Sequence, residues 1–180
     1  DEIHACTFHS FAQSQTNTYY KKLGYSELPT VMNRGDIYFL LRQRFDELKQ
    51  LRSTLFRRNP VQAIQSFQKV FEAFRQNLLS EIELNALQKQ ELNKAKYITD
   101  KKELEKIFQL ADLVDVYPQY QAWKKENNWI DYGDMIANLW KLIESNPVVL
   151  AELQGQYKHV IVDEFQDNNY ALSQIIEKIA

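Results

Sequence analysis

Two adjacent carboxylates follow a run of β-branched residues near the end of the chain. The pentapeptide Asp163-Glu164-Phe165-Gln166-Asp167 comes directly after Val160-Ile161-Val162. Three consecutive β-branched residues are typical of a strand buried on both faces of a parallel sheet, and ligands of such sheets bind beyond the carboxyl ends of the strands. Carboxylates at that place could hold a magnesium ion and orient a water molecule. The pattern therefore favours hydrolysis of a phosphoanhydride.

Each polar side chain of the pentapeptide suits a different part of that reaction. Asp163 is placed to hold Mg²⁺, Glu164 to polarise the attacking water, and Gln166 to contact the terminal phosphate of a nucleotide. The alternative is an acidic turn that caps the next helix, in which Asp167 would interact favourably with the helix dipole. The apolar run before the carboxylates and the Gln166-Asp167 pair after them favour the catalytic interpretation.

Composition and charge narrow the class of protein. The chain has 180 residues, of which 44% are hydrophobic and only four are glycine, and this favours a mainly helical globular fold. Its net charge is −2, so nucleic-acid binding would have to come from local basic patches. The single cysteine, Cys6, excludes an internal disulfide and fits a reducing compartment. The sequence shows no apolar run long enough to span a membrane, and we expect no signal peptide.

Helical periodicity dominates the middle of the chain, and strand-like segments lie near its two ends. Residues 3–8 and 157–163 are predicted to be strands, whereas residues 25–33 are predicted to be a loop. Pro118 is expected to end or kink the helix in which it lies. The predicted helix starts are Ser10, Asp36, Asn59-Pro60, Ser80, Thr99 or Asp100, Asp131 and Asn146-Pro147.

The two predicted strands cannot form a stable sheet by themselves. We therefore expect them to belong to one parallel sheet whose other strands lie outside these 180 residues, or to pack poorly without those strands. The helical block between them would then be an insertion into an α/β domain.

Three segments together resemble the UvrD/Rep-like superfamily 1 DNA helicases. Residues 163–167 resemble the second helicase motif of that family, and Thr7-Phe8-His9-Ser10 resembles its T-F-H-S motif. Residues 128–136 resemble the N-x-[IL]-D-F-D-D-L-[IL] segment that precedes the second motif, although Gly133 stands where the family usually has Asp. The order and spacing of the three segments agree with the family.

The resemblance implies an ATP-dependent DNA helicase, with ATP and Mg²⁺ as cofactors. Such an enzyme walks along single-stranded DNA, usually 3′ to 5′, and acts in DNA repair, recombination or replication. The implied fold is mainly α: a helical insertion domain (1B) at residues 11–125, attached to a partial RecA-like α/β domain of the P-loop NTPase class (1A) at residues 1–10 and 126–180. The expected partners are single-stranded and junction DNA, ATP and the remaining helicase domains of the same polypeptide, with no membrane. The expected location is the cytoplasm, at a bacterial nucleoid.

The sequence contains no G-x-x-x-x-G-K-[ST] loop to cradle nucleotide phosphates. We therefore expect these 180 residues to be part of a longer polypeptide that carries this Walker A loop upstream. By itself the chain is expected not to hydrolyse ATP.

Candidate DNA contacts come from two places. The resemblance implies backbone contacts by Thr7, Phe8 and His9, and helix capping is the alternative for His9 taken alone. The stretch from Arg34 to Arg58 holds seven basic residues against three acidic ones, and could either meet DNA phosphates or form a solvated helix face. Its candidate contacts are Arg42, Arg52, Arg57 and Arg58.

Other conspicuous residues are assigned structural roles. Asp131 and Asp134 are expected to cap a helix, and Phe67, Phe71 and Phe74 to lie in a core rather than to stack on bases.

Two other functions stay open at this point. One is a helical DNA- or protein-binding module that keeps a relic of the ATPase motif. The other is a metal-dependent nuclease that uses Asp163 and Glu164. A nuclease would need further carboxylates clustered beside a basic residue, and the sequence shows no such motif.

Overall fold

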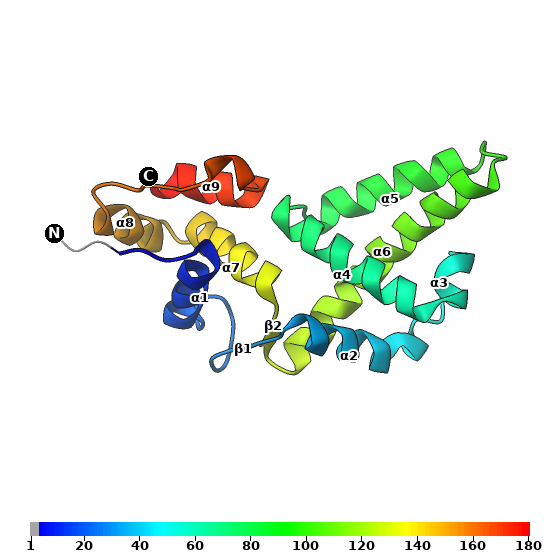
Figure 1. The fold of residues 1–180 in the computed structure, drawn as a ribbon, viewed down its shortest axis with the longest axis horizontal. Coiled ribbons are helices and arrows are strands. Elements are labelled where there is room, and N and C mark those ends of the chain that lie inside the picture. The colour runs from blue at the N-terminus through cyan, green and yellow to red at the C-terminus, as the bar shows by residue number, and fades with distance from the viewer. Residues whose placement is uncertain (1–3) are drawn as a thin grey trace. The chain divides into compact units, whose positions relative to one another are not determined.

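The computed structural model of the chain describes residues 4–180 and is mostly helical (Figure 1). These residues form two compact units, which we describe separately. Unit 1 consists of residues 4–31, Arg75–Leu78 and Asn128–Ala180, and unit 2 consists of Met32–Phe74 and Leu79–Asn127. Residues 11–31 thus lie in unit 1, whereas the predicted division placed them in the helical insertion.

Unit 1 is built around one amphipathic helix, α7 (Tyr132–Ser145). This helix contacts α1, α8 and α9, and it buries Leu139, Leu142 and Ile143 among them. The other elements of unit 1 are α1 (Phe8–Tyr19), β1 (Thr30–Val31), β2 (Trp129–Ile130), α8 (Pro147–Gln156), η2 (Phe165–Asp167) and α9 (Tyr170–Ile179). Residues 11–31 belong to unit 1 largely because α1 packs on α7.

The helix α1 begins earlier than predicted. Thr7 is its N-cap, because Thr7 Oγ1 accepts a hydrogen bond from Ser10 N at 3.2 Å. Ser10 therefore lies inside the first turn and is not the cap. A turn follows α1 as far as Gly24, whose φ of 89° is a conformation that favours glycine.

The predicted terminal strands do not form within the described residues. Residues 4–7 have no regular secondary structure and are exposed, while Ile3 lies outside the described residues. Residues 157–163 also form no strand, and Ile161 is 93% exposed. A strand needs a hydrogen-bonded neighbour, and neither described segment has one. The prediction of two strands in these segments is therefore wrong for this chain, and the segments instead pack poorly, as the alternative anticipated.

A short parallel pair forms elsewhere, between β1 and β2. Thr30 N donates to Asn128 O at 3.0 Å, and the Asn128 side-chain amide donates to Leu28 O at 3.1 Å. Asn128 has a φ of 54°, a left-handed conformation that asparagine tolerates better than most residues. β1 lies in the segment predicted to be a loop. The sequence could not indicate this strand, because two residues are too few to show an alternating pattern.

The regular elements of unit 2 are all helical. They are α2 (Arg34–Arg44), η1 (Phe45–Glu47), α3 (Thr54–Arg58), α4 (Pro60–Gln76, of which Arg75 and Gln76 belong to unit 1), α5 (Glu81–Ala95) and α6 (Lys101–Glu126). The predicted starts at Pro60, Ser80 and Asp100 are confirmed. Ser80 and Glu83 form a capping box at the start of α5, and Asp100 caps α6.

Pro118 was predicted either to end or to kink its helix. It does not end the helix, since α6 continues past it to Glu126. A proline inside a helix removes one backbone donor and costs about 3 kcal/mol. Its neighbours Tyr117, Tyr120 and Trp123 are all buried. Each large side chain buried in this way contributes roughly 1.5–3 kcal/mol, so tertiary packing outweighs the local cost.

Aromatic rings form the core of unit 2. Phe67 and Phe71 stack along α4 with centroids 5.7 Å apart, and the Phe71 ring lies 5.2 Å from the ring of Tyr120 on α6. Phe56 of α3 meets Phe67 edge-on at 5.3 Å. The exposed fractions of Phe67, Phe71 and Phe74 are 0%, 1% and 5%. The prediction that these three rings lie in a core is confirmed.

Hydrogen exchange should separate α4 from the N-terminal segment. We expect slow exchange for residues 64–74, because these amides are bonded within a helix whose inner face is buried. We expect fast exchange for residues 4–7, which are exposed and irregular. Exchange followed by mass spectrometry on the 180-residue chain measures both. Equal protection of the two segments would contradict an unpaired N-terminal segment.

Candidate functional site

The predicted catalytic carboxylates lie on the surface of unit 1. Asp163 and Glu164 form a turn between the irregular residues 157–162 and the short helix η2. Asp163 Oδ1 accepts a hydrogen bond from Glu164 N at 2.9 Å. Both side chains are exposed, so a ligand from solvent can reach their carboxylate oxygens.

The backbone of Glu164 is left-handed, with φ 49° and ψ 43°. Outside glycine this conformation costs on the order of 1 kcal/mol, and strain of this kind clusters at functional sites. The Gln166 side-chain amide donates to Glu164 Oε2. The structure thus brings together the two side chains predicted to act on water and on the terminal phosphate.

A cavity of about 400 Å³ in unit 1 is lined in part by Asp163. Thr7 and Phe8 line it together with Asp163, and α9 contributes isoleucine side chains. His4 Nδ1 and Tyr157 Oη are hydrogen-bonded at 3.0 Å, which joins the two irregular segments. The T-F-H-S segment and the carboxylate pair are therefore neighbours in space, although they are far apart in the sequence.

Magnesium fits the chemistry of Asp163. Mg²⁺ usually takes one or two protein carboxylates and completes its six ligands with waters and substrate phosphates. In the part of the chain that the structure describes, no group of three or more His, Cys, Asp or Glu side chains could hold a metal ion. The phosphates of a bound nucleotide and water molecules would therefore have to supply the remaining ligands.

The predicted DNA-contacting residues Thr7, Phe8 and His9 lie at the start of α1. Thr7 and His9 are exposed, and Phe8 is half-buried. The His9 ring meets the Tyr132 ring edge-on, with centroids 5.9 Å apart. The Thr7 hydroxyl already caps α1 through Ser10 N, so a phosphate here would depend more on the His9 ring and on backbone N–H groups.

Asp131 and Asp134 cap α7, as predicted. Asp131 Oδ1 accepts from Asp134 N at 3.0 Å, and Asp134 Oδ2 accepts from Asp131 N at 2.8 Å. Arg75 Nη2 donates to Asp131 Oδ2 at 2.9 Å, and Arg75 Nε lies 3.7 Å from Asp134 Oδ1. All three residues are buried. This motif segment therefore has a structural role, as an ionic cluster that starts α7.

Gly133 leaves the space that Arg75 occupies. A Cβ atom at position 133 would lie 2.2 Å from Arg75 Nε, far inside van der Waals contact. Gly133 lies inside α7 without a positive φ, so glycine is needed there for space and not for backbone conformation. The sequence marks Gly133 as a departure from the family pattern, but it gives no sign of Arg75, which lies on a distant helix.

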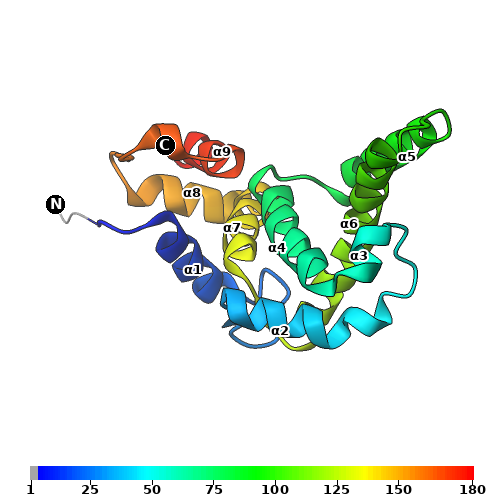
Figure 2. The same cartoon turned by 45° about the vertical axis from the view of Figure 1, so that its right-hand side comes forward.

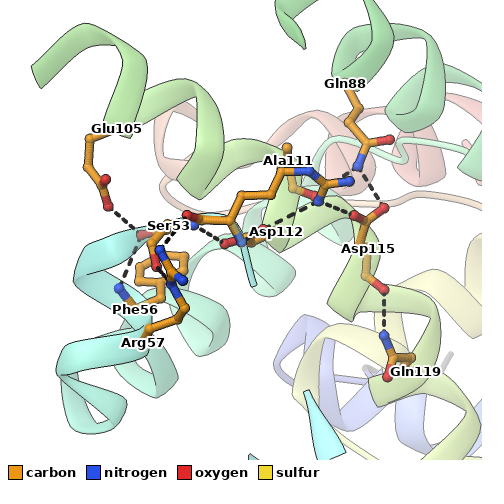
Figure 3. A network of polar contacts seen from close by, with 10 residues as sticks. Ser53, Phe56, Arg57, Gln88, Glu105, Ala111, Asp112, Asp115 and Gln119 are labelled. Atoms are coloured by element: carbon orange, nitrogen blue, oxygen red, sulfur yellow. Dashed lines mark hydrogen bonds and ion pairs between the residues drawn. The ribbon is translucent and has the colours of Figure 1, made fainter. Parts of the chain in front are cut away.

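In unit 2, carboxylates of α6 pair with part of the basic stretch. Arg52 Nη1 donates to Asp115 Oδ2 at 2.5 Å and lies 3.4 Å from Asp112 Oδ1. Asp112 also accepts the backbone N–H groups of Arg52 and Ser53, each at 2.8 Å. Burial raises the pKa of Asp112, and these N–H donors oppose the rise. Figure 3 shows Asp112 and Asp115 facing the segment around Ser53.

The other predicted DNA-contacting arginines differ in their availability. Arg57 turns back, and its guanidinium donates to Ser53 O and to Thr54 Oγ1, each at 3.4 Å. Arg42 and Arg58 are exposed, and within the described residues no carboxylate is bonded to either. Arg42 and Arg58 are therefore better placed than Arg52 to meet a phosphate.

Comparison with known proteins matches the whole chain to one family. The sequence model of the UvrD/REP helicase N-terminal domain matches residues 1–180. The chain is similar to the ATP-dependent DNA helicase srs2 of Schizosaccharomyces pombe, at 26% identity over 164 residues, which is 91% of this chain and 17% of that protein. It is similar to the ATP-dependent DNA helicase PcrA of Leuconostoc citreum, at 38% identity over 68 residues, covering 38% of this chain and 9% of that protein. PcrA of Bacillus subtilis is 35% identical over 66 residues, covering 37% and 9%.

The chain spans between 9% and 17% of the lengths of these three relatives. Among its described residues, no helix has the length and apolar character needed to cross a membrane.

Replacing Gly133 by Ala should destabilise unit 1. The new methyl group would displace Arg75 and break its buried ion pair with Asp131. Breaking a buried ion pair costs about 3–5 kcal/mol, and the better helix propensity of alanine returns about 1 kcal/mol. We expect the free energy of unfolding to fall by about 2 kcal/mol or more, measured by urea denaturation followed by circular dichroism.

The matched control for this change is Gly155→Ala on α8, where a Cβ would meet nothing within 4 Å. This variant should lose no stability. In an Arg75→Ala background, Gly133→Ala should cost nothing further, because the crowded side chain is gone. The same cost with and without Arg75 would rule out this explanation of Gly133.

Proposed function

Because the chain belongs to the UvrD/REP helicase N-terminal domain family, we propose that it supplies the ATP-hydrolysing carboxylates of an ATP-dependent DNA helicase. The whole protein would couple hydrolysis to movement along single-stranded DNA, from 3′ to 5′, in DNA repair, recombination or replication. The three relatives are named as ATP-dependent DNA helicases, which supports this activity for the protein of which the chain is a part.

The observation that carries the proposal is the joint placement of two motif segments in unit 1. Asp163 and Thr7 line the same cavity, and the exposed side chains of Glu164 and Gln166, which follow Asp163 in the chain, are bonded to each other. An enzyme that couples ATP hydrolysis to movement on DNA needs its nucleotide site next to a segment that senses the DNA. Asp163 would belong to the nucleotide site and Thr7 to the DNA-sensing segment, and the two residues lie next to each other.

The polar side chains divide the work of hydrolysis. Asp163 would hold Mg²⁺ together with nucleotide phosphates, and the bound ion would neutralise charge on those phosphates. Glu164 would orient and polarise the attacking water. Gln166, which donates to Glu164 Oε2, would position that carboxylate and contact the terminal phosphate.

We assign unit 1 to the partial RecA-like domain and unit 2 to the helical insertion. Unit 1 holds all three motif segments. β1 directly precedes unit 2 in the chain and β2 follows it, so the inserted helices begin and end at one parallel strand pair. The phosphate-binding loop and the other strands of the sheet would come from the rest of the same polypeptide.

The proposed DNA partner is single-stranded or junction DNA. Thr7, Phe8 and His9 would contact its backbone from unit 1, and Arg42 and Arg58 would contact phosphates from unit 2. A DNA partner would locate the protein at the nucleoid if its source is a bacterium.

Replacing Glu164 by Gln in the complete polypeptide should abolish ATP hydrolysis and spare ATP binding. The amide keeps the shape of the side chain but cannot polarise a water molecule as a carboxylate does. DNA-stimulated phosphate release and equilibrium binding of a labelled nucleotide measure the two properties. Glu177→Gln, an exposed glutamate on α9, is the matched control and should hydrolyse ATP normally. Near-normal turnover by the Glu164 variant would remove this residue from the mechanism.

Salt dependence should distinguish the arginines of unit 2. Each phosphate contact on single-stranded DNA contributes about 0.7 to the slope of log K against log salt. Replacing Arg42 and Arg58 together by Ala should therefore reduce the slope by about 1.4. Arg52→Ala should change the slope little but lower stability, because Arg52 is ion-paired with Asp115. Titration of a labelled oligonucleotide at several salt concentrations tests this, and an unchanged slope in the double variant would move the DNA path elsewhere.

A further inference from the structure

The turn between α5 and α6 concentrates positive charge. Residues 94–102, which we call the hairpin tip, contain four lysines and one acidic residue, Asp100. Both views show the tip standing away from α2, α3 and α4 of unit 2 (Figures 1 and 2). The four lysines are all exposed, and they are Lys94, Lys96, Lys101 and Lys102.

The one carboxylate of the hairpin tip is engaged by the backbone of α6. Asp100 Oδ1 accepts hydrogen bonds from Lys102 N at 2.9 Å and from Glu103 N at 2.8 Å. Its negative charge therefore lies against the positive end of the α6 dipole. Asp100 is needed to start α6, which leaves the lysine charge of the tip largely uncompensated.

The lysines themselves are only partly paired. Lys94 forms an ion pair with Glu91, and Lys96 Nζ donates to the neutral side chain of Asn93 at 3.0 Å. Among the described residues, no carboxylate is bonded to Lys96 or to the two lysines that open α6. At least three ammonium groups of the hairpin tip can therefore meet an anion.

Tyr97 presents its ring in the middle of these charges. Its exposed fraction is 87%, so the ring contributes almost nothing to the core of unit 2. The turn that carries it has a defined backbone, because Tyr97 N donates to Lys94 O at 3.0 Å and Ile98 N donates to Ala95 O at 3.4 Å. An accessible aromatic face is thus held between lysines.

We propose that the hairpin tip binds single-stranded DNA, with lysines on phosphates and the Tyr97 ring stacked on a base. Proteins hold single strands by this combination of cationic side chains that follow the backbone and an aromatic face that accepts any base. The identity of the nucleic acid as DNA rests on the proposed function. The surface is separate in sequence from Arg42 and Arg58, so it would be a second contact on unit 2.

The chemistry of the tip favours a single strand over other polyanions. A duplex offers phosphates, but its bases are stacked and leave no free face for Tyr97. An acidic protein surface would match the charge, but it would not need an exposed ring. The proposal therefore requires two separable effects, one from the lysines on salt dependence and one from Tyr97 on unpaired bases.

Fluorescence anisotropy of a fluorescein-labelled oligothymidylate, titrated with the 180-residue chain, tests both effects. Replacing Lys96 and Lys102 together by Gln should reduce the salt slope by about 1.4, at about 0.7 for each phosphate contact. Replacing Tyr97 by Ala should weaken binding at least about fivefold, while Tyr97→Trp should retain it. On a labelled duplex the Tyr97→Ala variant should bind like the unmodified chain.

The matched control replaces Lys89 and Lys106 by Gln. Both are exposed on the same two helices but lie outside the tip, so the net charge changes equally while the slope should stay the same. An unchanged slope in the tip variant, an equal change in the control, or an equal loss by Tyr97→Ala on duplex and single strand would each overturn the proposal. Failure of the unmodified chain to bind the oligonucleotide at low salt would do so as well.

The readout is independent of the proposed ATPase activity. The anisotropy assay needs neither ATP nor the Walker A loop, whereas the Glu164 experiment reports hydrolysis. If the hairpin tip has no affinity for DNA but the Glu164 variant loses hydrolysis, the second DNA contact is rejected and the proposed function is retained.

Discussion

The ion pairs of Arg75 with Asp131 and Asp134 hold the start of α7, and the core of unit 1 depends on that helix. Two buried carboxylates three residues apart would repel each other, although each accepts a backbone N–H in the capping box. Arg75 supplies positive charge that opposes this repulsion, and Gly133 leaves room for its guanidinium. Because α7 contacts α1 and α9, this cluster also sets where the T-F-H-S segment and the residues after Asp163 lie. We therefore assign residues 128–136 a structural role in positioning the proposed ATPase residues, and no role in hydrolysis itself.

Features of the fold that depend on local hydrogen bonds could be predicted from the sequence. Ser80, Asp100 and Asp131 begin helices because each accepts at least one backbone N–H from the next few residues, and those donors are always present. Features that depend on distant partners could not. Residues 157–163 have the composition of a strand but no neighbour to pair with, and α6 passes Pro118 because its flanking aromatic rings are buried. In both cases tertiary contacts, and not propensity, decide the outcome.

In the candidate site, too, features set by residues close in sequence could be predicted and features set by distant partners could not. The types and order of the motif residues indicate Asp163, Glu164 and Gln166 as candidates, whereas a count of charges along the sequence does not show which arginines of the basic stretch are ion-paired. The count treats neighbours in sequence as neighbours in space, whereas Asp112 and Asp115 come from α6 to meet Arg52. The hairpin tip is the opposite case. Its charge stays local, because its one carboxylate is used by the helix that it caps.

The exposure of the residues before Asp163 has a consequence for the proposed ATPase site. Ile161 is 93% exposed and Val160 is 40% exposed, and at roughly 25 cal/mol per Å² each would gain from burial beneath further strands. Under the proposed assignment, those strands come from the rest of the polypeptide, together with the phosphate-binding loop. Pairing would straighten residues 160–162 and thereby set the direction of the Asp163 carboxylate at the end of the strand. Completion of the sheet and assembly of the magnesium site would then be one event, which ties hydrolysis to the folded state of the whole domain.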